Sequence, residues 1–182
     1  QWESDFLVLA PDGMGQVMWR WMGERDVLDA IEDVKRHYNV DADRVTLNGL
    51  SNGGVGAYSI GARHAWRFAS VLPMAAAPSW LQYHRGRARP VERTLMEQWS
   101  SMAMTNNFRN TKLSFFHGTQ DGGPMSPAFP RELSKLLTGR GIEHTFREFD
   151  TGHDVLYWVH RRGKIYGELA KVRRNPRPPE VW

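Results

Sequence analysis

A serine stands among glycines in the stretch Asn48-Gly49-Leu50-Ser51-Asn52-Gly53-Gly54. An apolar run, residues 44–47, precedes this stretch, and a segment rich in glycine and alanine, residues 55–62, follows it. The pattern predicts a strand, a tight turn at Ser51 and then a helix. A serine at the tip of such a turn is presented as a nucleophile, in the arrangement called a nucleophile elbow.

The glycine spacing fits that turn. Its strained backbone brings the residues on either side of the serine together, so we expect Gly49 and Gly53 to remove side chains that would clash. The N–H groups at the start of the following helix favour negative charge on a substrate oxygen. One alternative is a glycine-rich turn that only links strand to helix. A phosphate cradle is disfavoured, because neither G-x-G-x-x-G nor G-x-x-x-x-G-K-[ST] occurs.

A serine nucleophile needs a base, and the base needs a carboxylate to orient it. Asp121 follows the apolar run at residues 112–116, and His153 follows the one at residues 143–149. An imidazole takes the serine proton and later returns it to the leaving group. The three residue types therefore predict acyl transfer with Ser51 as nucleophile, His153 as base and Asp121 as its partner.

Each of these residues has a simpler interpretation. Asp121 lies in an Asp-Gly-Gly turn, where the carboxylate often bonds only its own backbone, and His153 has the context of an ordinary surface histidine. Asp150 and Asp154 are rival carboxylates, but both are too near His153 in the chain to reach its ring from the far side. His117 is the second candidate base, and we interpret it as a residue that pins the turn carrying Asp121.

Strands and helices alternate along the chain. The apolar patterns predict strands at 5–10, 44–47, 68–74, 112–116 and 143–149, and helices at 26–38, 52–66, 91–104, 127–137 and 155–172. This alternation is typical of an α/β fold, a three-layer αβα sandwich around a mainly parallel sheet. Ser51, Asp121 and His153 each follow a strand, so they are expected at the same carboxyl edge, where such folds place their chemistry.

Composition limits the alternatives. The 182 residues are 41% hydrophobic and 24% charged, as expected for one globular domain, residues 1–174, with a proline-rich tail at 175–182. Because there is no cysteine, a disulfide, a thiolate metal site and a cysteine nucleophile are all excluded. No run has the length of a membrane span. The seven histidines are scattered, so we predict neither a metal nor a cofactor.

The net charge of +4 is mild, and much of the basic excess lies between residues 161 and 177. We interpret it as a solvated helix face and tail. A nucleic-acid or anionic-surface contact is the weaker alternative, because no aromatic interleaving or recognition motif accompanies the charge.

Three segments, residues 49–54, 117–121 and 152–154, resemble the signatures of α/β-hydrolase esterases of the prolyl-oligopeptidase-like, feruloyl-esterase and polyhydroxybutyrate-depolymerase-like group. Residues 10–13 and 26–45 also resemble that group, so the similarity covers nearly the whole chain. The resemblance implies hydrolysis of a small-molecule or polymer-linked carboxylic ester through an acyl-enzyme, without a cofactor. It slightly favours an extracellular or periplasmic location. The alternatives are a serine peptidase of prolyl-oligopeptidase type and a noncatalytic module that retains the scaffold.

The chain departs from the family in one respect. In that group an earlier strand, ending in a His-Gly loop, supplies the second N–H of the oxyanion hole, whereas here only one helix separates the first predicted strand from the elbow strand. The N–H of Asn52 remains as one donor, and loss of the other typically costs about 10²–10³ in turnover. Together with a tail that resembles a linker, this predicts a segment of a longer polypeptide or a chain completed by another.

Two tryptophans are candidate substrate-binding residues. Trp21 and Trp80 fall in the two irregular stretches expected to flank the site, together with Trp19, Tyr83 and Trp99. They could line an aromatic acyl or alcohol pocket. The alternative is that they pack the loops against the core.

Overall fold

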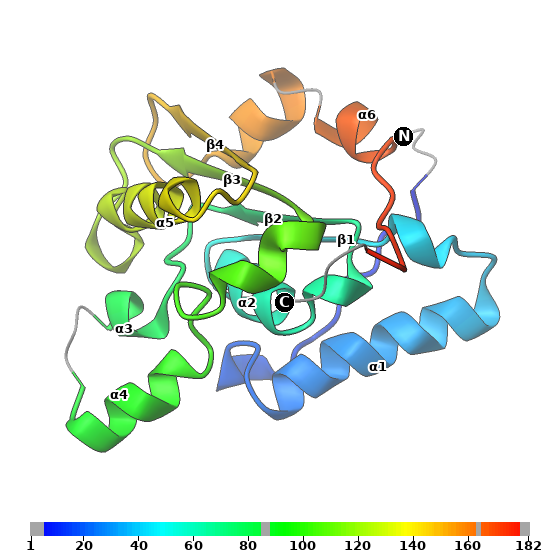
Figure 1. The fold of residues 1–182 in the computed structure, drawn as a ribbon, viewed down its shortest axis with the longest axis horizontal. Coiled ribbons are helices and arrows are strands. Elements are labelled where there is room, and N and C mark those ends of the chain that lie inside the picture. The colour runs from blue at the N-terminus through cyan, green and yellow to red at the C-terminus, as the bar shows by residue number, and fades with distance from the viewer. Residues whose placement is uncertain (1–5, 85–87, 163–164, 179–182) are drawn as a thin grey trace. The chain divides into compact units, whose positions relative to one another are not determined.

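The computed structural model describes residues 6–84, 88–162 and 165–178 (Figure 1). The chain divides into two compact units, and the boundary along the sequence lies between residues 42 and 43. Within the described residues, no helix has the length and apolar character needed to cross a membrane. The single domain over residues 1–174 stays a prediction, and residues 179–182 of the predicted tail lie outside the described part.

The first unit contains a 3-10 turn, η1 (Gly15–Val17), and the long helix α1 (Met22–His37). The strand predicted at residues 5–10 is wrong for residues 6–10, which form no strand, and residue 5 lies outside the described residues. Leu7 and Val8 are 52% and 83% exposed. The physical reason is that an apolar run becomes a buried strand only when a neighbouring strand pairs with it and a layer covers it.

The second unit contains a parallel sheet of four strands in the order β1-β2-β3-β4. The strands are β1 (Thr46–Leu50), β2 (Ser70–Met74), β3 (Lys112–Gly118) and β4 (His144–Phe149). From β2 on, each strand pairs parallel with the strand before it in the chain, and each such pair needs a crossover connection between the strands. The parallel α/β fold is thereby confirmed, and all four carboxyl ends lie at one edge.

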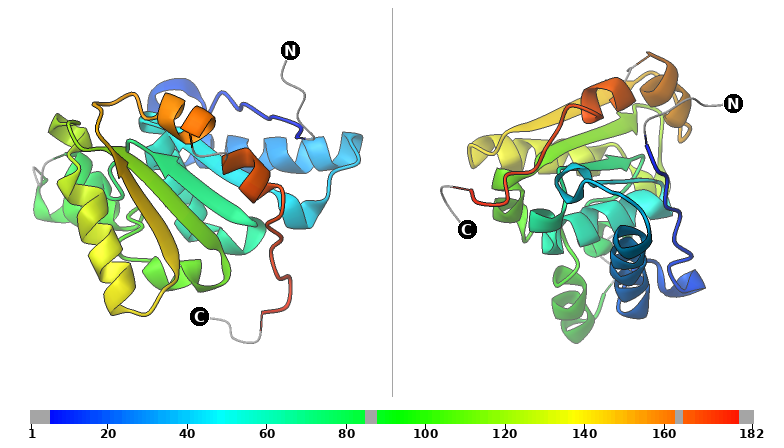
Figure 2. Two further views of the ribbon diagram at one scale, coloured as in Figure 1. Left: turned by 90° about the horizontal axis from the view of Figure 1, so that it is seen from above. Right: turned by 90° about the vertical axis from the view of Figure 1, so that its right-hand side faces the viewer.

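Helices cover both faces of this sheet (Figures 1 and 2). The α-helices of the second unit are α2 (Asn52–Arg63), α3 (Trp80–Tyr83), α4 (Pro90–Glu97), α5 (Ala128–Gly139) and α6 (Ile165–Leu169). Shorter turns are η2 (Ala42–Arg44), η3 (Ala65–Arg67), η4 (Thr105–Asn110), η5 (Gly123–Met125) and the π-helical turn η6 (Trp158–Arg162). In both figures α2 and α5 lie on one face, and η6 and α6 lie on the other.

Alternate strand residues build the two cores. On the α6 face a buried cluster joins β2 and β3 to the last segment of the chain: Leu72, Met74, Ala75, Phe116, Val155, Val159, Ile165 and Leu169. On the opposite face, Phe115 meets Tyr58 of α2 edge-to-face, with ring centroids 6.0 Å apart. This strict alternation of faces completes the three-layer sandwich.

Two predicted helices are shorter than expected. The helix predicted at 91–104 ends at Glu97, because the buried Ser101 hydroxyl and N–H both donate to the Pro78 carbonyl, at 2.7 and 3.1 Å. The helix predicted at 155–172 is divided into η6 and α6, and residues 163–164 lie outside the described part. The π-helical turn has a longer period than an α-helix, and with it Val155, Val159, Ile165 and Leu169 all lie in one buried cluster.

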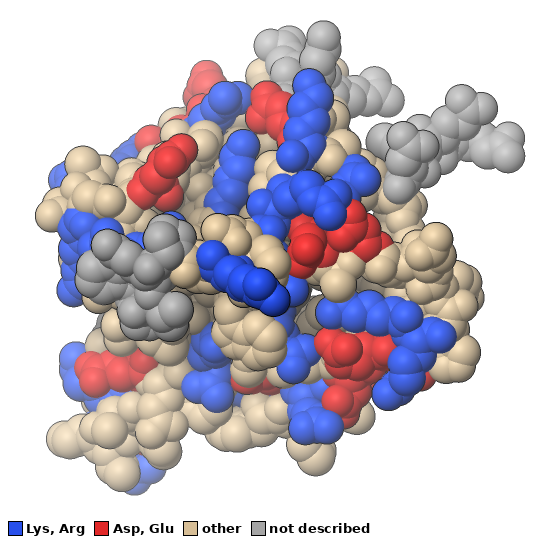
Figure 3. Space-filling view, turned by 45° about the vertical axis from the view of Figure 1, so that its right-hand side comes forward, with Lys and Arg blue, Asp and Glu red and all other residues tan. Residues whose placement is uncertain are grey.

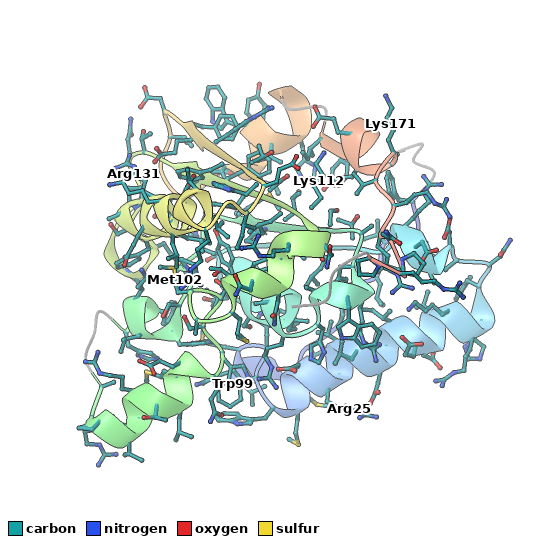
Figure 4. The ribbon with its side chains drawn as sticks, in the orientation of Figure 1. Arg25, Trp99, Met102, Lys112, Arg131 and Lys171 are labelled. Carbon is teal, nitrogen blue, oxygen red and sulfur yellow. The ribbon has the colours of Figure 1, made fainter. Side chains whose placement is uncertain are left out.

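Charged side chains of both signs are intermixed on the face shown in Figure 3. One basic residue of the C-terminal segment has a structural role. Arg174 pairs with Asp43 at 2.9 Å and donates to the Trp66 carbonyl at 2.7 Å. Arg131 of α5, labelled in Figure 4, pairs with Glu148 of β4 at 2.8 Å. The first pair anchors the tail at the amino end of the sheet, and the second joins α5 to an outer strand.

Candidate active site

Ser51 is the single residue between β1 and α2. Its backbone has φ 57° and ψ −121°, a positive φ that is strained for a residue with a side chain. Two hydrogen bonds hold it there: its N–H donates to Met74 O at 2.9 Å, and its carbonyl accepts from Val55 N at 3.0 Å. The Ser51 hydroxyl does not cap α2. This is the local geometry that the sequence predicts for a nucleophile elbow.

The glycines around Ser51 have different roles from those predicted. A Cβ on Gly49 would lie 2.1 Å from the Gly53 carbonyl oxygen, so Gly49 is needed as expected. A Cβ on Gly53 would meet nothing within 4 Å, so the clash predicted there is wrong. The second close approach is at Gly54, where a Cβ would lie 2.6 Å from Ala76 Cβ and 2.7 Å from Met74 O. The tight turn at Ser51 brings the start of α2 against β2, so position 54 must also lack a side chain.

Asp121 lies in the turn after β3, and its two carboxylate oxygens have different partners. Oδ1 accepts from Gly122 N–H at 2.8 Å, and Oδ2 accepts from Nδ1 of His153 at 2.7 Å. The side chain is only 8% exposed. The carboxylate therefore bonds both its own turn and the histidine, and the first bond fixes the orientation of the oxygen that faces the ring.

His153 lies in the loop after β4, and its side chain is 45% exposed. Because a carboxylate only accepts, Nδ1 of the ring carries the shared proton. In a neutral ring Nε2 is then the acceptor, which is the tautomer a general base requires. The structure thus joins two of the three predicted residues directly.

The loops after β3 and β4 are joined by their backbones. Thr119 N donates to Phe149 O at 2.9 Å, and Gln120 N donates to Thr151 O at 3.0 Å. A Cβ on Gly118 would lie 1.9 Å from the Gly152 carbonyl oxygen, so the loops could not approach this closely with any other residue there. We call these contacts the β3–β4 clasp. It positions Asp121 beside His153.

The rival carboxylates are engaged elsewhere or exposed. Asp150 accepts from Gln120 Nε2 at 2.8 Å and from the Thr119 hydroxyl at 3.4 Å, so its carboxylate is part of the clasp. Asp154 is exposed, and its carbonyl accepts from the Thr151 hydroxyl at 3.5 Å.

His117 is nearly fully buried in β3, and its Nε2 lies 2.7 Å from the Met125 carbonyl. Burial lowers the pKa of its ring below the ordinary value of 6.5, although hydrogen bonding to the Met125 carbonyl opposes this shift. A buried ring committed to a carbonyl cannot abstract a proton from a substrate. The geometry therefore matches the interpretation of His117 as a residue that pins the turn.

Ser51 lies at the same carboxyl edge as the Asp121–His153 pair, at the end of β1, with β2 between β1 and β3. Among the described residues, no hydrogen bond joins the Ser51 hydroxyl to the His153 ring. Bonds of this kind are often long before substrate binds. The N–H of Asn52 is at the first position of α2, where helix N–H groups have no intrahelical partner.

The predicted substrate-binding tryptophans differ in exposure. Trp80 is 1% exposed, and its ring meets that of Tyr83 with centroids 5.4 Å apart, which favours the packing alternative. Trp21 belongs to the first unit, is 58% exposed, and has the Arg20 guanidinium 4.7 Å from its ring centroid. A pocket role for Trp21 stays a prediction.

One residue at this edge gave no signal in the sequence. Ala75, directly after β2, is fully buried with φ 44°, and its N–H donates to Phe116 O at 2.9 Å. Glycine at this position would have indicated a positive φ, but alanine does not. Ser51 and Ala75, both with a strained backbone, thus lie at the same carboxyl edge of the sheet, and only Ser51 was predictable from the sequence.

The sequence model of the prolyl oligopeptidase family matches residues 5–169 of this chain. The chain belongs to the prolyl oligopeptidase family. A search of curated protein sequences found no match. Membership of this serine hydrolase family agrees with the strained strand-to-helix turn at Ser51 and with the serine, aspartate, histidine order along the chain.

Solved structures share the fold of this family member at low sequence identity. Acylaminoacyl peptidase of Pyrococcus horikoshii has TM-score 0.69 and 18% identity, over 87% of this chain and 29% of that one. Porphyromonas gingivalis dipeptidyl peptidase 4 has TM-score 0.67 and 18% identity, over 79% and 22%. S-formylglutathione hydrolase (FrmB) of Staphylococcus aureus has TM-score 0.60 and 15% identity, over 81% and 60%. This chain therefore spans less than two thirds of each.

Proposed function

We propose that this member of the prolyl oligopeptidase family hydrolyses carboxylic esters through an acyl-enzyme on Ser51. The observation that carries the proposal is the 2.7 Å bond from His153 Nδ1 to Asp121 Oδ2, at the sheet edge where Ser51 follows β1. When substrate binds, the loop that carries His153 would place Nε2 of the ring beside the Ser51 hydroxyl. The substrate would be a small-molecule or polymer-linked ester.

In the proposed reaction, Nε2 of His153 takes the Ser51 proton as Oγ attacks the carbonyl carbon. Asp121 stabilises the resulting imidazolium with its negative charge and by accepting a hydrogen bond from Nδ1–H, without taking the proton. The tetrahedral intermediate collapses when the ring returns its proton to the leaving alcohol. Water then attacks the acyl-enzyme with the same base, and a second collapse releases the acid and restores the Ser51 hydroxyl.

The developing oxyanion needs hydrogen-bond donors. The N–H of Asn52, at the start of α2, is the proposed first donor, and the helix dipole adds to it. Deleting one donor of this kind typically costs about 10²–10³ in turnover. We therefore expect slower turnover with the Asn52 N–H as the single oxyanion donor than with two donors.

A serine peptidase is the second candidate function, because the family and two of the three structural neighbours carry peptidase names. The same residues would serve, with His153 protonating a leaving amine. Parallel assays with p-nitrophenyl acetate and with an aminoacyl p-nitroanilide separate the two functions. Preference for the anilide would support the peptidase.

The first prediction concerns Ser51. We expect a fluorophosphonate probe to label the protein, and both labelling and ester turnover to vanish in Ser51→Ala, because the probe and the acyl group would both bond to Ser51 Oγ. The matched control is Ser134→Ala, which removes a hydroxyl of α5 that bonds His144 Nε2 at 2.8 Å. Full activity in Ser51→Ala would refute the proposal. A folded wild-type protein that never labels would support a noncatalytic module.

A further inference from the structure

His117 is a polar ring at a fully buried strand position, which is costly unless its nitrogens are used. Nε2 lies 2.7 Å from the Met125 carbonyl oxygen. Because a carbonyl only accepts, Nε2 carries the proton, and the neutral ring has none on Nδ1. The single N–H of the His117 ring therefore donates to the Met125 carbonyl oxygen.

This bond closes the turn that carries Asp121. It links the end of β3 to η5, eight residues along the chain, and Asp121 lies between its two ends. Met125 is itself buried, and its N–H donates to Gly122 O at 3.0 Å. The Asp121 turn is thus fixed at its far end by a side chain from the strand that begins it.

The same ring also faces the functional carboxylate. His117 Nε2 lies 3.6 Å from Asp121 Oδ2, the oxygen that accepts from His153. That separation exceeds a hydrogen bond, so the His117 proton does not compete with His153 for this oxygen. The other titratable groups that act on the ring are His153 and Glu148, and Glu148 is paired with Arg131 of α5. A neutral His117 leaves the Asp121 charge available to His153.

We propose that His117 is a positioning residue for the Asp121–His153 pair. Its neutral N–H holds the Met125 carbonyl and so directs Oδ2 of Asp121 at the His153 ring. The catalytic consequence rests on the function proposed above, whereas the structural consequence does not. Two kinds of measurement therefore test it separately.

The experiment compares three variants. His117→Gln keeps an N–H donor close to the Nε2 position, and His117→Phe keeps a ring without a donor. The control is His144→Phe, because His144 also bonds a backbone carbonyl, that of Ile142 at 2.9 Å, but from the amino end of β4. All three change a histidine on the same sheet, and only the first two change the Asp121 turn.

The first measurement is the far-downfield proton resonance of a histidine Nδ1–H bonded to carboxylate, recorded at low temperature and assigned by its loss in His153→Ala. We expect it in the wild type, His117→Gln and His144→Phe, and its loss by solvent exchange in His117→Phe. The second is ester kinetics. There His117→Phe should lower kcat on the order of 10²-fold, as misplacement of a catalytic group does, with little change in KM. His117→Gln should recover most of that loss.

The outcomes are distinct. A folded His117→Phe that keeps both the resonance and kcat would overturn the inference, and so would a His117→Gln as impaired as His117→Phe. If His117→Phe does not fold, the comparison of His117→Gln with His117→Asn decides, because the shorter amide cannot reach Met125 O. A wild type that shows the resonance but never labels at Ser51 refutes the proposed function alone, and the resonance series still tests His117.

Discussion

The backbone at Ser51 concentrates strain at the point where the chemistry is expected. A non-glycine residue with positive φ typically costs about 1–3 kcal/mol. The bonds of Ser51 with Met74 and Val55 hold it between a strand and a helix that are both fixed by the core. Strain of this kind persists only where the surroundings determine it, so the elbow depends on its glycine neighbours.

Gly49 and Gly53 give a matched pair that tests this dependence. Gly49→Ala should lower the thermal midpoint strongly or prevent folding, because its Cβ would overlap the Gly53 carbonyl at 2.1 Å. The Cβ that Gly53→Ala adds in the first turn of α2 meets nothing within 4 Å, and alanine stabilises a helix by up to about 1 kcal/mol relative to glycine. Thermal unfolding of both variants is the measurement. Equal midpoints would show that the turn does not require Gly49.

At the residue scale, what the sequence predicted was set by residue type and order. Serine, aspartate and histidine each follow a strand, and side-chain chemistry alone indicated their roles. Three other features were missed: the requirement for glycine at positions 54 and 118, and the strained Ala75. They depend on how closely two backbones approach, which no single residue type encodes.

At the scale of elements, the β3–β4 clasp determines the geometry of the pair. Two backbone bonds join the loops, and Asp150 adds a side-chain bond from Gln120 at 2.8 Å. Because β3 and β4 are in register from Leu113 with His144 to Gly118 with Phe149, the two loops begin side by side. The Asp121–His153 distance is therefore a consequence of strand pairing.

Gly118 and Gly152 test the clasp from either side. Gly118→Ala should separate the loops, since its Cβ would lie 1.9 Å from the Gly152 carbonyl, and we expect slower probe labelling and a lower thermal midpoint. Gly152→Ala adds a methyl group that meets nothing within 4 Å, so its midpoint should stay near that of the wild type. The clasp would lose its proposed role if Gly118→Ala labelled at the wild-type rate.

The strands and helices were predictable where an apolar sequence pattern also had a partner element to pack against. Strands β1 to β4 were predicted because each apolar run has a partner strand and two covering layers. The run at residues 6–10 has the same composition but forms no strand, and the final helix is divided although its sequence is helical. Both differences are set by tertiary partners, which local periodicity does not include.

At the scale of the whole molecule, the sheet and the three proposed catalytic residues all belong to the second unit. The first unit has one long helix, and among its described residues no strand. Only one apolar side chain of α1, Val27, is fully buried. An isolated helix of this length is marginal in water, so the first unit has too little core to be stable by itself.

We therefore expect the whole chain to unfold in a single cooperative transition, with the calorimetric enthalpy equal to the van't Hoff value. A fragment of residues 1–42 should show no cooperative transition, because α1 has only one buried apolar side chain and a single helix is marginal in water. Scanning calorimetry of the chain and the fragment makes the comparison. An early separate transition, or a cooperative transition of the fragment, would mean that residues 1–174 are not one domain.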